Sequence, residues 1–429
     1  MDDERRPGPR WPRWPRWLRL VVVDHRPLRR REFRLLYVGQ AVSFAGSMVT
    51  YVALPYQVFA LTRSPLAVGL LSLAELAPLL ATALLGGALA DAHDRRRLLL
   101  LTELAMAATS GVLLLNAASA HPRLWPLYAA AAGTAALDGL QRPSLEALPP
   151  RLVERDELPA AAALQSLRGN LGLIGGPALG GLLVADFGLP LAYGVDLASF
   201  LCSLVALSLL QAVPPPPDAE RVRLRGVLQG LRYARSRQEL LGSYLVDVVA
   251  MLFGFPTALF PAIAGRHGGP GVLGLLYAAP SVGALLASGT SGWTARVRRH
   301  GLAILLAAGV WCAAIAGFGV AGPLPLALGL LVVAGAADMV SGLFRSTMWN
   351  QTVPDALRGR LAGIELLSYA SGPLLGNLEA GAVAARWGVR VSLVSGGLLG
   401  IAGVALLALL LPQFRAYDAD RSAARAARG

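Results

Sequence analysis

The sequence contains no lysine, so all 39 of its basic residues are arginines. A Walker A loop binds nucleotide phosphates with a lysine, and a retinal or pyridoxal Schiff base needs a lysine amine. The absence of lysine therefore excludes ATP hydrolysis at a Walker A site and excludes Schiff-base chemistry.

Cysteine and histidine are also scarce, with two and five residues. Cys202 and Cys312 lie within apolar runs, where we expect small packing residues and no disulfide. The histidines lie in tails or between apolar runs and form no HExxH pattern. We therefore expect no metal site and no bound cofactor.

Charged residues make up only 15% of the 429 residues, against 55% hydrophobic ones, which is too little charge to cover a soluble surface. Apolar runs long enough to cross a bilayer recur about twelve times. They lie at roughly 34–60, 65–90, 98–118, 124–148, 158–185, 190–212, 240–264, 270–293, 301–320, 323–348, 359–385 and 390–411. The sequence predicts an all-α integral membrane protein whose backbone hydrogen bonds close within helices.

The placement of arginine explains the net charge of +13, which in a soluble protein would suggest nucleic acid binding. With the N-terminus inside, most arginines fall in the two tails and in the loops after spans two, four, six, eight and ten. Few fall on the other side: Arg63, Arg123, Arg266, Arg386 and Arg390. The positive-inside rule then places both termini in the cytoplasm and makes the bilayer, not nucleic acid, the partner.

A break at about 213–239 divides the chain into two halves. Pro214–Pro217 form a stiff spacer, and RVRLRGVLQGLRYARSRQ at 221–238 follows with leucines on one helical face and arginines on the other. We expect a cytoplasmic tail at 1–33 without a cleavable signal, a six-helix bundle at 34–212, a loop with an amphipathic helix at 213–239, a second bundle at 240–412 and a tail at 413–429.

The two halves echo each other. PLAVGLL at 65–71 matches PGVLGLL at 270–276, and GGPALGG at 175–181 matches SGPLLGN at 371–377, in the same order. These echoes indicate one six-helix unit used twice.

GGALADAHDRRR at 86–97 places charge between two long apolar runs. Glycines such as Gly87 let two helices approach closely, and Asp91 can accept hydrogen bonds from a neighbouring helix N-terminus. We expect Arg95, Arg96 and Arg97 to stay in cytoplasmic water. The pattern favours a conformational latch over a catalytic site.

Twelve spans in two halves, the central loop and this motif resemble the major facilitator superfamily. Its motif GxLaDrxGRR matches at Gly87, Leu89, Asp91, Arg95 and Arg96, and departs at 92 and 94, where this chain has Ala and Asp. The Asp-Arg-Arg version and VPDALRGRLAG at 353–363 resemble the branch of enterobactin-exporter-like drug and siderophore exporters. The resemblance implies two pseudo-symmetric six-helix bundles, alternating access and a monomer.

Span five indicates the direction of transport. The residues that resemble the antiporter motif GxxxGPxxGG are Gly172, Gly176, Pro177, Gly180 and Gly181. Pro177 removes a backbone donor and bends the helix, while glycines four apart permit tight helix contact. The resemblance implies export, and ordinary small-residue packing is the alternative.

Ionisable residues inside the spans must pair or face a cavity, because burying a charge in the bilayer is costly. Asp138, Arg142 and Glu146 are four apart and share one helical face, as do Asp338 and Arg345. A proton-coupled exporter needs a carboxyl group that gains and loses a proton as its surroundings change. Asp138 and Glu75 lead the candidates, with Arg142, Asp247 and Asp338 beside them, while Glu103 and Glu146 lie closer to helix ends. Purely structural ion pairs are the alternative.

By the resemblance, spans one, four, seven and ten line the cavity. Their polar and aromatic candidates are Gln40, Tyr51, Tyr56, Gln57, Phe253 and Phe255. We expect a secondary active transporter that uses the proton gradient to export small amphipathic molecules, such as drugs, siderophores or secondary metabolites. A mainly apolar cavity with scattered acids favours cationic or lipophilic substrates.

Other functions on the same fold are a lipid or glycan flippase and a proton-independent facilitator. GTSG at 289–292 also fits an intramembrane serine hydrolase with Ser291 as nucleophile, but no histidine lies in a later span to act as its base. We therefore expect a transporter and not an enzyme. Abundant Ala, Arg and Gly indicate a bacterium with a GC-rich genome and a protein of its cytoplasmic (inner) membrane.

Overall fold

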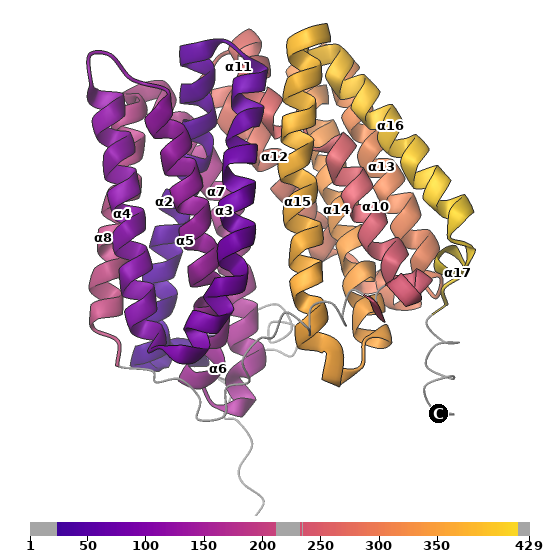
Figure 1. Cartoon of the computed structure of the whole chain (residues 1–429), viewed down its shortest axis with the longest axis horizontal. Helices are drawn as coiled ribbons and strands as arrows, with labels where there is room; N and C mark the ends of the chain where they lie inside the picture. The colour runs from indigo at the N-terminus through magenta and orange to yellow at the C-terminus, as the bar shows by residue number, and fades with distance from the viewer. Residues whose placement is uncertain (1–23, 212–231, 234, 419–429) are drawn as a thin grey trace, which may run out of the picture.

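Two helical bundles stand side by side in the computed structural model, which describes residues 24–211, 232–233 and 235–418 (Figure 1). Those residues contain helices and turns and no β-strand. The all-α prediction is therefore confirmed. The tail before 24 and most of the expected amphipathic segment at 213–239 lie outside the described residues.

The first bundle contains six long helices. They are α2 (Arg31–Thr62), α3 (Pro65–Ala92), α4 (Arg95–Ala118), α5 (Trp125–Ala147), α7 (Leu158–Phe187) and α8 (Leu189–Ser208). Three short helices lie at one end of the molecule: η1 (Arg26–Arg29), α6 (Pro149–Leu152) and η2 (Arg155–Glu157). We call this end, where the described chain also starts and stops, the terminal end, and the opposite end the far end.

The second bundle repeats this order. Its helices are α10 (Gln238–Gly254), η3 (Thr257–Leu259), α11 (Phe260–His267), α12 (Pro270–Gly289), η4 (Ser291–Arg296), α13 (His300–Val320), α14 (Leu324–Thr352), α15 (Asp355–Trp387), α16 (Val389–Leu410) and α17 (Pro412–Arg415). The repeat extends to the turns, because α7 and α15 both end at a single left-handed glycine, Gly188 with φ 82° and Gly388 with φ 91°. Only glycine adopts that backbone without strain.

Ten helical segments of the described chain are long and apolar enough to cross a membrane, with α10 to α11 counted as one. Helices α5 and α15, with 23 and 33 residues, are also long enough to cross a membrane, and both pack against α3. A total of twelve spans stays a prediction.

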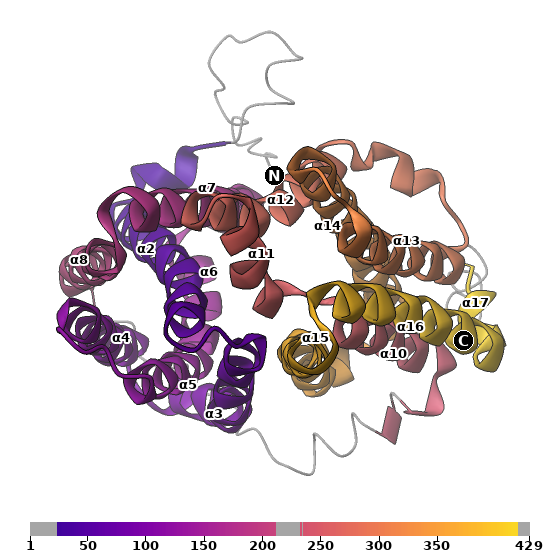
Figure 2. The same cartoon turned by 90° about the horizontal axis from the view of Figure 1, so that it is seen from above.

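The seventh predicted span is not one helix. We expected a continuous span at 240–264, but α10 ends at Gly254 and the chain resumes in η3 and α11. Proline disfavours helical geometry in the residue before it, and Phe255, which precedes Pro256, is extended with φ −107° and ψ 96°. The break lies deep in the molecule, between the two bundles (Figure 2).

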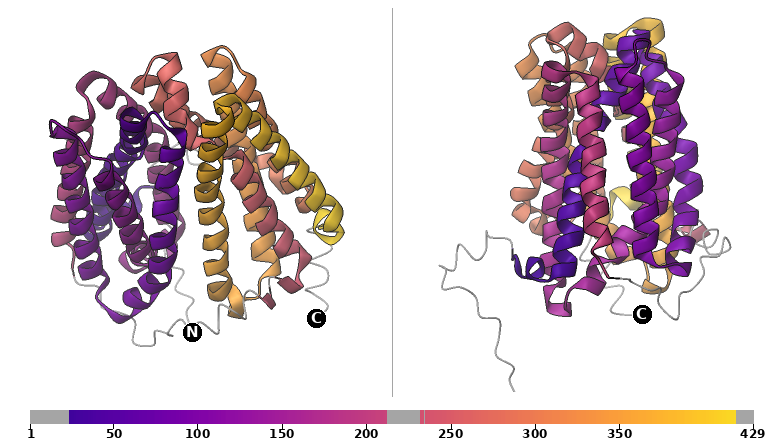
Figure 3. Two further views of the ribbon diagram at one scale, coloured as in Figure 1. Left: turned by 45° about the horizontal axis from the view of Figure 1, so that its top comes forward. Right: turned by 90° about the vertical axis from the view of Figure 1, so that its left-hand side faces the viewer.

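The bundles meet along two seams, α3 against α15 and α7 against α12. A Cβ atom added to Gly69 would lie 2.7 Å from the carbonyl oxygen of Asn377, and one added to Gly274 would lie 2.6 Å from that of Pro177. Gly69 and Gly274 lie in the first two turns of α3 and α12, which both begin at the far end. The bundles diverge toward the terminal end (Figure 3). Gly69 and Gly274 occupy matching positions in the two sequence echoes, so the seams are related by the internal repeat.

Candidate functional site

A cavity of about 680 Å³ lies inside the first bundle and reaches the seam with the second. Its lining is mostly apolar, with contributions from α2, α3, α4, α5, α7 and α8 and a smaller share from η3, α12 and α15. The lining carries six ionisable acidic or basic side chains: Glu75, Glu103, Asp138, Arg142, Glu146 and Arg168. The bundle therefore encloses charged groups within an apolar wall, as a small-molecule site requires.

The break in the seventh span closes the far end of this cavity. Thr257 Oγ1 and the Ala258 backbone N–H both donate to Asn377 Oδ1, each at 2.8 Å. Tyr277 donates its hydroxyl to the Thr257 carbonyl at 3.3 Å and stacks edge-on against Tyr51, with ring centroids 5.0 Å apart. These contacts connect α2, η3, α12 and α15 across the far end of the cavity. The predicted unbroken helix at 240–264 did not include this closure. The Phe255–Pro256 pair was the available signal.

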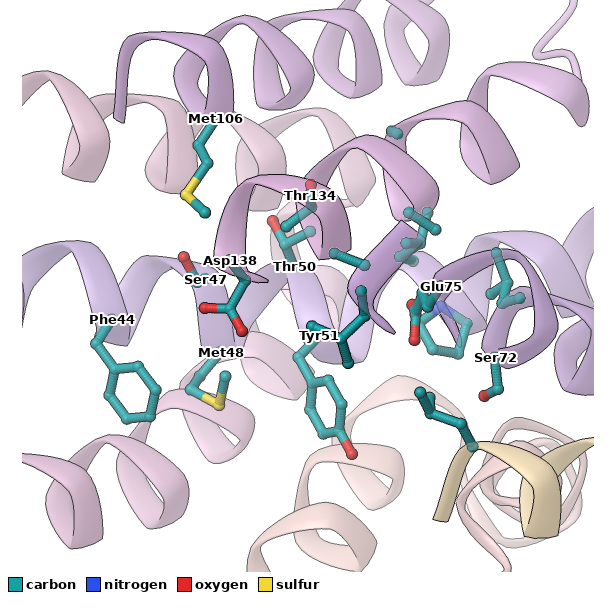
Figure 4. Close-up of a pocket in the computed structure, with 18 of the residues that line it drawn as sticks. Phe44, Ser47, Met48, Thr50, Tyr51, Ser72, Glu75, Met106, Thr134 and Asp138 are labelled. Atoms are coloured by element: carbon teal, nitrogen blue, oxygen red, sulfur yellow. The ribbon is translucent and has the colours of Figure 1, made fainter. Parts of the chain in front are cut away.

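Asp138 on α5 and Glu75 on α3 both point into the cavity (Figure 4). Among the described residues, neither carboxyl group has an arginine or histidine nitrogen within 4.0 Å. Two acids without a paired cation thus face the same enclosed space. This geometry is the one expected of groups that bind a proton or a cationic substrate.

Glu103 is buried more deeply than its position in the sequence suggested, with 1% of its surface exposed. Gln40 Nε2 donates to Glu103 Oε1 at 2.7 Å, Gln141 Nε2 donates to the same oxygen at 3.0 Å, and Ser43 Oγ donates to Oε2 at 3.3 Å. The expectation that it lies near a solvated helix end is wrong, because α2 and α5 cover this part of α4. Gln40 lines the cavity and holds this carboxyl group.

Asp196 on α8 is a second buried acid, and sequence reasoning missed it. Thr50 Oγ1 and Ser110 Oγ each donate to its Oδ2 at 2.6 Å, while its Oδ1 has no hydrogen-bond partner. An aspartate within the apolar run at 190–212 was the signal. Its hydroxyl partners come from α2 and α4, so it ties three helices together.

Two arginines flank the terminal side of the cavity. Arg142 Nε donates to Glu146 Oε1 at 3.1 Å, and its guanidinium lies 5.5 Å from the ring centre of Tyr369 on the other bundle. The Arg168 guanidinium lies 6.0 Å from the ring centre of Phe44, and its buried Nε has no hydrogen-bond partner. The predicted Asp138–Arg142–Glu146 face is therefore present, with Arg142 paired to Glu146.

A second charged group lies in the other bundle, away from the cavity lining. Arg345 Nη1 is 2.7 Å from Asp247 Oδ1, and its Nη2 is 3.9 Å from Asp338 Oδ1. The seven-residue spacing on α14 predicted that Asp338 and Arg345 share a face. The closer partner, Asp247 on α10, could not be paired with Arg345 from spacing because it comes from another helix.

The aromatic and amide candidates divide into two groups. Tyr51 and Phe255 line the cavity together with Gln40, whereas Tyr56, Gln57 and Phe253 are absent from its lining. Gln57 accepts a hydrogen bond from the Tyr193 hydroxyl at 2.7 Å inside the first bundle, and Tyr56 packs against the apolar cores of both bundles.

The glycines of the span-five motif make close helix contacts. A Cβ atom on Gly172 or Gly176 would overlap Phe44 or Met48, and one on Gly180 would lie 3.0 Å from the Cα of Val49. These three glycines thus hold α7 against α2. Gly181 faces the other bundle instead, since its Cβ atom would lie 2.7 Å from the Cα of Gly274. The Pro177 carbonyl lies at the same seam.

Arg95 of the 86–97 motif does not stay in water as expected, and Arg96 is partly buried. Arg95 is only 7% exposed and donates to the Ala147 carbonyl at the end of α5, and Arg96 donates to the Leu207 carbonyl at 3.0 Å and to that of Ser208. The carbonyl end of a helix attracts cations, so these side chains bind at the C-terminal ends of α5 and α8. The side chains at 87 and 91, including Asp91, lie outside what the structure describes.

The part of the chain that the structure describes contains no cluster of three or more His, Cys, Asp and Glu side chains placed to hold a metal ion. Ser291 of the GTSG pattern lies in η4, at the terminal end. The charged groups of the cavity are therefore carboxyl and guanidinium groups alone.

Comparison with known structures gives the fold. A nucleoside transporter, NupG, matches with a TM-score of 0.72 at 12% identity, covering 89% of this chain and 98% of that one. A bacterial homologue of the iron transporter ferroportin matches with a TM-score of 0.69 at 15% identity, covering 90% of this chain and 99% of the other.

Comparison of sequences gives the family. The model for transmembrane secretion effectors matches residues 23–427. The enterobactin exporter EntS of Shigella boydii is 32% identical over 88% of this chain and 92% of its own length, and that of Citrobacter koseri is 31% identical over 90% and 93%. The protein is therefore a multi-pass inner-membrane transporter and not an enzyme, and the chain belongs to the transmembrane secretion effectors of the major facilitator superfamily, the family of the enterobactin exporters.

Proposed function

We propose that this protein is a proton-coupled exporter that carries siderophores or related small amphipathic molecules out of the cytoplasm. The observation that carries the proposal is the pair of unpaired carboxyl groups, Asp138 and Glu75, facing one mainly apolar cavity. The relatives that are named enterobactin exporters support siderophores as the class of cargo.

The cavity size is compatible with this cargo class. Ligand sites for drug-sized molecules occupy about 300 to 1,000 Å³, and this cavity of about 680 Å³ lies within that range. Its walls combine apolar surface from Leu54, Met106 and Phe200 with the carboxyl groups and with Arg168. Such a wall suits a molecule with an apolar body and a few polar groups. Because the Nε of Arg168 has no hydrogen-bond partner, the cavity can also bind an acidic group of the cargo. The cargo class therefore includes molecules that carry acidic as well as cationic groups.

Alternating access would follow from the two seams. The bundles touch closely at Gly69 and Gly274 near the far end and diverge at the terminal end. With cytoplasmic termini, this conformation is an inward-facing state. The excess of arginine at that end supports this orientation. Rocking of the bundles about the cavity would release cargo on the other side. The single chain holds the whole cavity, which supports a monomer.

Protons would supply the energy, and no cofactor is needed. In an outward-facing state Asp138 or Glu75 would take up a proton, and it would release the proton inward when cargo or water arrives. One proton moving down about 100 mV yields about 2.3 kcal/mol, and each pH unit adds about 1.4 kcal/mol. One proton can therefore sustain a cargo gradient of roughly a hundredfold.

The test is uptake of a siderophore or a fluorescent drug into everted membrane vesicles that contain this protein. The proposal predicts accumulation when a proton gradient is imposed and loss of accumulation when a protonophore collapses it. Vesicles without the protein are the control. Transport that is unaffected by the protonophore would contradict proton coupling and support a facilitator or a flippase instead.

A further inference from the structure

A second cavity of about 550 Å³ lies outside the transport path, between α13 and α14 of the second bundle. These two helices stand at the outer side of the bundle (Figure 2). Its lining is apolar except for one arginine, Arg299, and includes Trp293, Leu306, Val310, Val333 and Phe344. We call it the α13–α14 groove.

The groove faces the bilayer. Leu306, Val310 and Val333 lie along it and are among the exposed large apolar side chains of the protein. In a chain that crosses the membrane, such side chains are in contact with lipid. Small residues, Ala303, Ala307 and Ala336, leave the space between the helices unfilled.

The length of the groove equals the depth of one leaflet. On α14 the lining runs from Val333 to Phe344, which at about 1.5 Å per residue is about 16 Å. The hydrocarbon core of a bilayer is about 30 Å thick, so one leaflet is about 15 Å deep. An acyl chain that enters from the terminal end would therefore be long enough to fill the groove.

The mouth of the groove carries positive charge at the level of the lipid headgroups. Arg299 is exposed and lines the mouth, and the exposed Arg296 and Arg298 lie within three residues of it. Trp293 covers the same end, with its ring centre 6.1 Å from that of Phe344. Tryptophan prefers the membrane interface, and arginine clusters beside a membrane helix attract anionic headgroups.

We propose that the α13–α14 groove binds an anionic phospholipid, with one acyl chain between the helices and the headgroup phosphate on Arg299. A zwitterionic lipid offers the same acyl chain but no net charge to the arginines, so the site favours a lipid such as phosphatidylglycerol. The proposal does not depend on proton coupling or on the cargo.

The test is lipid retention by the purified full-length protein, measured by native mass spectrometry after exchange into micelles doped with phosphatidylglycerol or phosphatidylcholine. We expect Arg299→Gln to weaken phosphatidylglycerol binding about fivefold and to leave phosphatidylcholine binding unchanged. Arg299→Lys should retain the preference. Arg390→Gln, which removes an exposed arginine at the far end of the same bundle, is the matched control and should have no effect.

A second variant tests the acyl-chain part of the site. Ala336→Leu places a larger side chain in the groove and should reduce binding of both lipids, while Ala405→Leu on the exposed face of α16 should not. Equal retention of both lipids by the wild-type protein would overturn the proposed headgroup preference. Loss of phosphatidylglycerol binding in Arg390→Gln to the same extent as in Arg299→Gln would show that only overall charge matters, and would also overturn the proposal.

Discussion

Adding one methyl group at the seam between the bundles should shift the protein away from the conformation described above. In Gly274→Ala the new Cβ atom would lie 2.6 Å from the Pro177 carbonyl oxygen and 3.0 Å from the Cα of Gly181. Ordinary van der Waals contact begins at 3.4 Å, so the first contact is about 0.8 Å too short. Both opposing atoms belong to the backbone of α7 and cannot rotate away. The two bundles must separate there.

The free-energy cost of this close contact sets how far the population of the two conformations shifts. Overpacking a tight contact costs about 1 to 3 kcal/mol, and each 1.4 kcal/mol changes an equilibrium tenfold. The population of the conformation described above, in which the bundles touch at the far end, should therefore fall about 5- to 150-fold relative to a conformation in which they separate there. Gly271→Ala is the matched control, because it lies one turn away on α12 and its Cβ atom would meet no heavy atom within 4 Å.

The assay is a distance measurement by double electron–electron resonance between spin labels at Ser119 and Gly322, which lie in far-end loops of the two bundles. The two natural cysteines are first replaced by alanine. We expect Gly274→Ala to add a longer distance that is absent in the wild type and in Gly271→Ala. Identical distance distributions in all three proteins would show that backbone contact at this seam does not hold the far end closed.

Three further changes test the interior. Glu103→Leu leaves two amide donors and one hydroxyl group without their acceptor and should lower the free energy of unfolding by about 2 to 5 kcal/mol. Glu103→Gln keeps an acceptor and should lower it less. Thermal unfolding in detergent measures both variants. Arg345→Gln leaves the buried Asp247 without its cation and should lower the free energy of unfolding by about 3 to 5 kcal/mol, which reduces the abundance of the protein in the membrane. Adding Asp247→Asn to this variant should restore part of that abundance. Arg142→Gln is the control and should change abundance little, because its partner Glu146 is exposed. Gly175→Ala should be neutral or slightly stabilising in the same unfolding assay, because its Cβ atom meets open space; a clear loss would contradict the packing described for α7.

The sequence predicted the helical fold because a bilayer leaves few alternatives. Apolar runs of spanning length must form helices, and the echoes at 65–71 and 270–276 predicted the repeat that places Gly69 and Gly274 at matching seams. What one sequence could not supply was the contact between helices distant in the chain. Asp247 pairs with Arg345 across two helices, and no spacing rule within one helix reveals that pair.

Local geometry accounts for the remaining differences. Pro256 ends α10 early because the residue before a proline avoids the helical region, and hydropathy alone does not register this effect. Arg95 is buried and Arg96 partly buried because the ends of α5 and α8 offer carbonyl partners, and the positions of these carbonyls depend on where those helices stop. Glu103 was misjudged because its burial depends on α2 and α5 covering it, and depth along its own helix gave no sign of that cover.

If a carboxyl group in the cavity couples cargo movement to protons, Asp138→Asn and Glu75→Gln in everted vesicles should reveal it. The measurement compares active accumulation under an imposed proton gradient with passive exchange of cargo across the same membrane. We expect whichever of the two variants removes the proton site to abolish accumulation and to leave exchange intact, because the cavity and the seams remain. Full gradient-driven accumulation by both variants would show that neither carboxyl group couples cargo movement to protons.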